Sequence, residues 1–255
     1  MINIFTKSKR SQVTIFIILG LILVVSIALI FLVFRQPTLE VSPSGNPEAY
    51  IEKCMRDYGK EALNILMPQG GDIEPKGSIK YQGKDITYLC YNENFYDPCI
   101  MQRPMLIEHI ESEISSYLEP RMQGCFSLLR QGLENKGYEI DMQSMSIKTE
   151  LKVGKIFMTT NRKLQTTKDE ETRKYEKFTA EISSPIYKLA WFAQEITSQE
   201  AKYCYFNTDG FNMNYPTFEA RKEMIDDSKI YNVKDRITNQ NFVFAIRGCV
   251  MPPGL

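Results

Sequence analysis

The hydrophobic pattern of this chain begins with one uninterrupted apolar run. Residues 13–34 (VTIFIILGLILVVSIALIFLVF) contain no charged side chain. As an α-helix this run would be about 33 Å long, which matches the hydrocarbon core of a bilayer. The sequence therefore predicts a transmembrane helix over residues 13–34, with the lipid bilayer as its partner.

Basic residues flank the apolar run unequally. Lys7, Lys9 and Arg10 precede it, whereas only Arg35 follows it directly. Because positive residues collect on the cytoplasmic side, residues 1–12 are expected to be a cytoplasmic leader and the C-terminal part to be extracytoplasmic. A cleavable secretory signal is the alternative, but the run is long for one and lacks an Ala-x-Ala step at its end. We therefore expect a retained, single-pass anchor in the cell membrane.

The junction before the run carries a resemblance to a known signal. Residues 9–14 (KRSQVT) place basic residues, a small residue and Gln12 directly before the apolar helix. This arrangement resembles the class III signal of archaeal type IV pilin-like proteins, and the resemblance implies cleavage between Ser11 and Gln12. Pilin stems of that family usually carry Glu at the fifth mature position, where this chain has Phe16. The chain therefore resembles an archaeal single-pass surface protein with a pilin-like leader more than it resembles a major pilin.

After the run the pattern changes twice. Residues 35–46 are rich in proline and serine and poor in apolar side chains, which predicts an extended tether. In residues 47–255 apolar positions first recur at helical spacing, from Asn46-Pro47 and again from Pro104, with Pro120 expected to kink or restart the second helix.

Alternation at a period of two, typical of strands, begins near Ile140. In chain order we expect two short strands within residues 78–89, a meander within 147–182, a helix from Ser184, and final strands over 229–235 and 242–248. This order of elements predicts an α+β domain over residues 47–255, with helices packed on one face of an antiparallel sheet.

All six cysteines follow the predicted span, on its extracytoplasmic side. An even number of cysteines in an oxidising compartment indicates disulfides, and the close-spaced pairs of a zinc site are absent from the sequence. Cys54 and Cys125 lie on apolar helical faces and are expected to pair. Cys90 and Cys99 flank one short loop, which favours a local bridge. This leaves Cys204 and Cys249 as the third pair.

The sequence offers few candidates for chemistry. The 31 basic and 31 acidic residues balance and are interleaved, so no basic face for nucleic acid is expected. His109 is the single histidine, and it falls off the apolar stripe of its helix, which favours a solvated face over a metal site with Glu113. Residues 207–214 (NTDGFNMN) resemble a calcium loop but lack the closing glutamate, which favours an ordinary turn.

The loop between Cys90 and Cys99 is the candidate recognition surface. It carries Tyr91, Phe95 and Tyr96 among amide and carboxylate side chains. Such rings suit contact with a sugar or a partner protein, although rings of this kind also pack beneath loops.

These features predict a membrane-anchored cell-surface protein that serves binding, adhesion or envelope structure, without enzymatic activity, a metal or a cofactor. Its partner would be an envelope protein, a glycan or a filament. Two alternatives stay open. One is an accessory pilin-like subunit of a type IV-type filament, and the other is an envelope-acting hydrolase that uses paired carboxylates.

Overall fold

The computed structural model describes residues 18–24, 26 and 45–251, in a chain that divides into two compact units, 1–40 and 41–255. In the first unit, residues 18–24 and residue 26 are helical. The rest of the predicted span, the leader and most of the tether lie outside the described residues. Within the described ranges, no helix has both the length and the apolar character needed to cross a bilayer.

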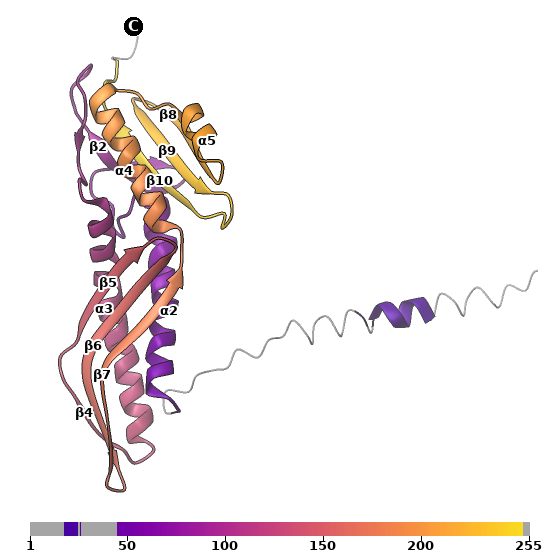
Figure 1. The fold of residues 1–255 in the computed structure, drawn as a ribbon, viewed down its shortest axis with the longest axis vertical. Helices are drawn as coiled ribbons and strands as arrows, with labels where there is room; N and C mark the ends of the chain where they lie inside the picture. The colour runs from indigo at the N-terminus through magenta and orange to yellow at the C-terminus, as the bar shows by residue number, and fades with distance from the viewer. Residues whose placement is uncertain (1–17, 25, 27–44, 252–255) are drawn as a thin grey trace, which may run out of the picture. The chain divides into compact units, whose positions relative to one another are not determined.

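The second unit, called the folded domain below, is an elongated α+β body (Figure 1). Two long helices run side by side along one half of it, and a four-stranded sheet covers them. The other half holds a second sheet with two shorter helices against it. The elements in chain order are α2 (Pro47–Leu66), the 3₁₀ helix η1 (Met67–Gln69), β1 (Ser78–Tyr81), β2 (Lys84–Tyr91), β3 (Ile100–Met101), α3 (Leu106–Glu134), β4 (Glu139–Met142), β5 (Ser146–Lys152), β6 (Lys155–Lys168), β7 (Glu171–Ser183), α4 (Ile186–Tyr203), α5 (Thr208–Asn214), β8 (Phe218–Ile225), β9 (Ser228–Asp235) and β10 (Asn241–Arg247).

Helix α2 begins where the sequence predicts. Asn46 accepts a hydrogen bond from the Ala49 N–H at 3.2 Å, and Pro47 occupies the first helical turn. Helix α3 does not restart at Pro120, one of the two expectations for this residue, because a single helix contains it. Pro120 is exposed, so its ring meets water and not the core.

The first sheet is the predicted meander. Strand β6 lies in its centre, with β7 on one side and both β5 and β4 on the other. Side chains of α3 cover the free edge of β5: Glu111 accepts the Leu151 N–H at 2.7 Å, and the Ser115 hydroxyl accepts the Thr149 N–H at 3.1 Å. An edge covered in this way cannot pair with a strand of another molecule.

The second sheet corrects the expectation of a single antiparallel sheet. Its strand order is β1-β2-β10-β9-β8, with β3 beside β2, and the β2–β10 pair is parallel. Strand β8 and helix α5 were not expected from the sequence. The sheet curls, and side chains of its two edge strands are in contact: the Tyr81 hydroxyl of β1 donates to Glu223 of β8 at 2.6 Å.

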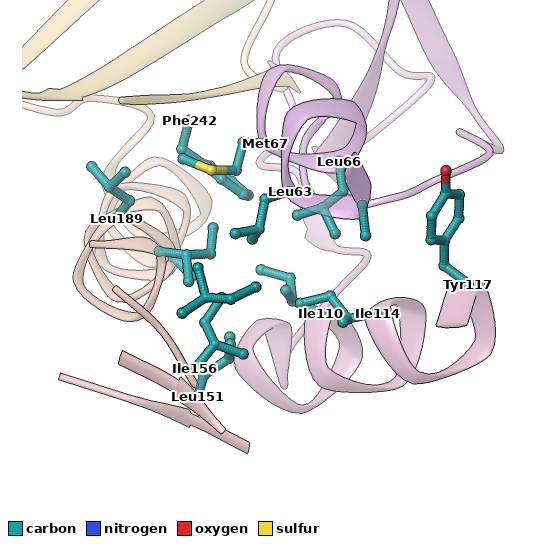
Figure 2. Packing of buried hydrophobic residues seen from close by; sticks show 14 of the residues in the cluster. Leu63, Leu66, Met67, Ile110, Ile114, Tyr117, Leu151, Ile156, Leu189 and Phe242 are labelled. Carbon is teal, nitrogen blue, oxygen red and sulfur yellow. The ribbon is translucent and has the colours of Figure 1, made fainter. Parts of the chain in front are cut away.

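One apolar core joins the two halves (Figure 2). Leu63 of α2 and Ile110 of α3 meet Leu151 and Ile156 of the first sheet, and each of these side chains is at most 5% exposed. Phe242 of β10, which is fully buried, extends the same core into the second sheet. The domain is therefore a single packed body with two sheets.

Three disulfides join the six cysteines in the pairs expected from the sequence. Cys54–Cys125 links α2 to α3 across 71 residues of chain. Cys90–Cys99 links two residues that are 9 positions apart and so closes a short loop. Cys204–Cys249 joins the end of α4 to the segment after β10.

Candidate recognition cleft

The loop from Tyr91 to Pro98 is held at its base by the second sheet. Strands β2 and β3 pair antiparallel with Cys90 opposite Met101, so the chain leaves β2 and returns to it around the loop. The Cys90–Cys99 disulfide closes this base, with Cα atoms 5.3 Å apart. The loop therefore projects from a fixed base.

The loop is also bound along its length to the chain segment that follows β10. Asn92 N–H donates to the Arg247 carbonyl at 2.8 Å, Tyr96 N–H to the Val250 carbonyl at 2.8 Å, and Cys249 N–H to the Asp97 carbonyl at 2.7 Å. At Gly248 the two segments approach so closely that an added Cβ would lie 2.7 Å from the Cys99 Cβ. This contact requires a residue without a side chain at position 248.

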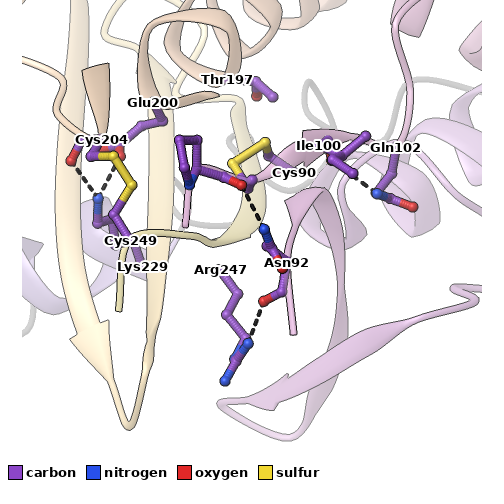
Figure 3. The surroundings of a disulfide bond; sticks show 12 residues. Cys90, Asn92, Ile100, Gln102, Thr197, Glu200, Cys204, Lys229, Arg247 and Cys249 are labelled. Carbon is purple, nitrogen blue, oxygen red and sulfur yellow. Dashed lines mark hydrogen bonds and ion pairs between the residues drawn. A yellow bond between two sulfur atoms is a disulfide. The ribbon is translucent and has the colours of Figure 1, made fainter. Parts of the chain in front are cut away.

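The second disulfide at this end is supported by a buried polar cluster (Figure 3). Lys229 donates to the Glu200 carboxylate and to the Cys204 carbonyl, the latter at 2.9 Å. Glu200 also accepts from the Tyr231 hydroxyl. Burial and the Glu200 carboxylate raise the pKa of Tyr231 above its usual range, so this hydroxyl stays protonated and remains a donor.

Arg247 connects the loop to the β8–β9 turn. Its Nε donates to Asp227 at 2.7 Å, and its Nη1 donates to the Asn92 carbonyl, as Figure 3 shows for the second contact. The guanidinium carbon lies 5.6 Å from the centre of the Tyr91 ring and 5.7 Å from that of Phe95. At these distances a cation attracts the face of an aromatic ring, so Arg247 positions both rings of the loop.

A cleft of about 760 Å³ opens between these segments. It is lined from three parts of the chain: the loop, the β8–β9 turn with the adjoining ends of both strands, and the segment after β10. The lining residues are Phe95, Met224, Asp226, Asp227, Lys229, Gly248, Cys249, Val250 and Met251. Phe95 is 40% exposed, and Met224 and Met251 are more exposed still.

The structure separates the three aromatic residues that the sequence singled out. Phe95 lines the cleft, Tyr91 packs edge-on against Tyr88 with ring centres 5.1 Å apart, and Tyr96 is 59% exposed. None of the three is buried beneath the loop. Among the other lining residues, Met224, Asp226 and Met251 gave no sequence signal, since they join the loop only through the fold of the second sheet.

The expectation of a solvated face for His109 was wrong. Its side chain contacts the buried carboxylate of Asp72, which also accepts from Thr87 at 2.8 Å and from Arg103 at 3.2 Å. Burial opposes ionisation of Asp72, but hydrogen bonds from His109 and Thr87 and the charge of Arg103 together lower its pKa. Glu113, the suggested metal partner, instead accepts the Ile73 N–H at 2.8 Å. His109 thus holds the loop after η1 against α3.

Residues 207–214 form a capped helical turn. Asn207 accepts the Gly210 N–H at 3.0 Å at the start of α5. Among the described residues there is no cluster of three or more His, Cys, Asp or Glu side chains placed to hold a metal ion.

Comparison with known proteins yields no relative. No protein-family model, no curated protein and no solved structure matches the chain.

Proposed function

We propose that this chain is a membrane-anchored, extracytoplasmic binding protein without enzymatic activity. In this proposal the cleft beside the Cys90–Cys99 loop receives an apolar segment of a partner protein of the cell envelope. The observation that carries the proposal is the construction of the cleft, whose flexible apolar side chains are exposed while two disulfides and a hydrogen-bonded backbone fix its walls.

The chemistry of the lining favours a protein segment. Met224 and Met251 are unbranched and adaptable, and such side chains are over-represented at surfaces that accept peptides of varied shape. Phe95 adds a ring already oriented by Arg247. Rigid aromatic anchors of this kind contribute much of the binding free energy at protein interfaces.

The charges at the rim favour a basic residue in the partner. Asp227 is paired with Arg247, and Lys229 is occupied by Glu200. Asp226 is exposed at the turn, so the charge that the rim presents to a partner is negative. An apolar segment flanked by Lys or Arg is the complementary ligand.

The position of the cleft in the folded domain suits an anchored receptor. Figure 1 shows the start of α2 at one end of the domain and the C-terminal end of the described chain at the other. The cleft includes residues 248–251 and so lies at the end remote from α2's first turn. The point at which the chain enters α2 and the cleft therefore lie at opposite ends of the folded domain.

The proposed location is tested by adding a protease to intact cells. Residues 36–255 should be removed while a small membrane-held stub remains, because basic residues before the apolar run place the C-terminal part outside. Protection in intact cells, with cleavage only after lysis, would contradict the proposed location.

A further inference from the structure

A second cavity, of about 470 Å³, lies between α4 and α5 and shares no residue with the recognition cleft. Aromatic rings and polar side chains line it together. The lining residues are Trp191, Phe192, Glu195, Ile196, Gln199, Phe206, Asn207, Gly210, Phe211, Asn214 and Tyr215.

The floor of this cavity is a rigid aromatic cluster. Phe192 is 4% exposed, and its ring meets those of Phe211, Tyr215 and Phe218 at 4.8–4.9 Å between centres, steeply inclined in each case. Edge-to-face packing of this kind fixes ring orientation. The floor is therefore formed before any ligand arrives.

The rim of the cavity presents two rings to solvent. Trp191 is 44% exposed and Tyr215 is 41% exposed, although both also contact Phe192. A large ring left half-exposed beside a cavity offers an apolar surface that a ligand can cover.

The polar groups of the cavity are placed by the two helices. Gln199 donates to Glu195 at 2.8 Å across one turn of α4, and Asn207 is fixed by its cap on α5. Asn214 completes this set at the end of α5. A carboxylate and amides beside one aromatic surface provide both acceptors and donors to a ligand.

The lining discriminates between classes of ligand. It contains no Lys or Arg, and Glu195 is acidic, so an anion would find no counter-charge. A purely apolar ligand would cover Glu195 and the amides without hydrogen bonds, which is costly. A sugar ring fits both requirements, because its C–H face packs on an aromatic ring and its hydroxyls bond to carboxylate and amide groups.

We propose that the α4–α5 cavity is a binding site for a neutral saccharide. The sugar face packs against the rings of Tyr215 and Trp191, and its hydroxyls bond to Glu195 and the neighbouring amides. This site is independent of the proposed partner cleft, so either can fail without the other.

Trp191 provides a direct probe, because it is the single tryptophan of the chain. Full-length oxidised protein in detergent is titrated with neutral hexoses, N-acetylhexosamines and their short oligomers while Trp191 fluorescence is recorded. At least one sugar should give a saturable change in emission. Repeating the titration with the same sugar attached to a soluble polymer distinguishes a free ligand from the glycan of a surface polymer.

Two variants and a matched control complete the test. Tyr215→Ala and Glu195→Gln should each weaken binding of the responding sugar at least about tenfold, since the first removes an aromatic surface and the second replaces a charged acceptor by a neutral amide. Tyr203 is an exposed ring on α4, the helix of Glu195, and lies outside the cavity. Its replacement in Tyr203→Ala should leave the affinity for the sugar unchanged. Circular dichroism confirms that the variants are folded.

The proposal is overturned by the absence of a saturable response to any neutral sugar. A response to choline or to acidic sugars alone would also overturn it. So would a sugar response that is unaffected in folded Tyr215→Ala and Glu195→Gln proteins.

Discussion

Gly248 is the residue on which the geometry of the recognition cleft most depends. It is buried at the start of the C-terminal segment, where this segment approaches Cys99 of the loop most closely. No motif in the sequence marks this position, because glycine is needed there only to make room for Cys99, which lies about 150 residues earlier in the chain.

Gly248→Ala should destabilise the domain by about 1–3 kcal/mol, because the new methyl group overlaps Cys99 and the loop must move. The free energy of unfolding from urea titration measures this effect. Gly124→Ala is the matched control, since an added Cβ there meets no atom within 4 Å and alanine favours the helix. Equal stability of the two variants would contradict the close contact at Gly248.

Asp72 is the second residue whose role follows from its surroundings. Its carboxylate joins the loop after η1 to β2 through Thr87, to α3 through His109, and to the segment before α3 through Arg103. Helical spacing was enough to predict that His109 lies off the apolar stripe of α3. Its contact with Asp72 could not be predicted, because the fold brings together two residues that are 37 positions apart.

Asp72→Asn should lower the free energy of unfolding by about 3 kcal/mol near neutral pH, since it removes one member of a buried charged cluster. The pKa of Asp72 is lowered in the folded state relative to the usual 3.8. Its contribution is therefore present above that value and is lost as the pH falls through the folded-state pKa. The difference between wild type and variant should be larger at about pH 5 than at about pH 2.5, and a difference independent of pH would contradict this role.

At the scale of elements, local patterns sufficed for helices α2, α3 and α4 and for the first sheet. The β5–β6–β7 meander connects consecutive strands by tight turns, so alternation along the chain was enough to predict it. The second sheet could not be predicted in the same way. Its parallel pair joins β2 to β10 with most of the domain between them, and periodicity carries no information on such a pairing.

The disulfides were predictable for a related reason. Cys54 and Cys125 follow from helical faces, and Cys90 and Cys99 from their proximity in the chain, so the third pair remained by elimination. The recognition cleft was predicted only in part, through Phe95, because its other walls come from β8, β9 and the C-terminal segment.

Two of the three disulfides should differ in their contribution to stability. Replacing both Cys54 and Cys125 by Ser should cost about 4 kcal/mol, and replacing both Cys90 and Cys99 should cost about 3 kcal/mol, since the first closes 71 residues and the second 9. Urea unfolding of the two double variants provides the comparison. A larger loss for the Cys90–Cys99 variant would show that native contacts of that loop outweigh chain entropy.

At the scale of the whole molecule, the proposed receptor consists of a predicted anchor, a domain linked by disulfides and a cleft at the end of that domain remote from the start of α2. The fold and the cleft belong to the described residues, whereas the anchor and its orientation rest on the apolar run and its basic flank. The proposed function requires all three, because a receptor must be held at the membrane and must present its cleft to a partner.

Site-specific photo-crosslinking in native membranes determines whether the cleft contacts a partner protein. A photoreactive residue placed at Phe95 lies in the cleft, and one placed at Leu128, an exposed position on α3, serves as the control. We predict a discrete crosslinked product to one envelope protein from position 95 and none from position 128. The product should be lost when Met224 is changed to Asp. The absence of a crosslink from position 95, or the same products from both positions, would contradict a partner-binding cleft.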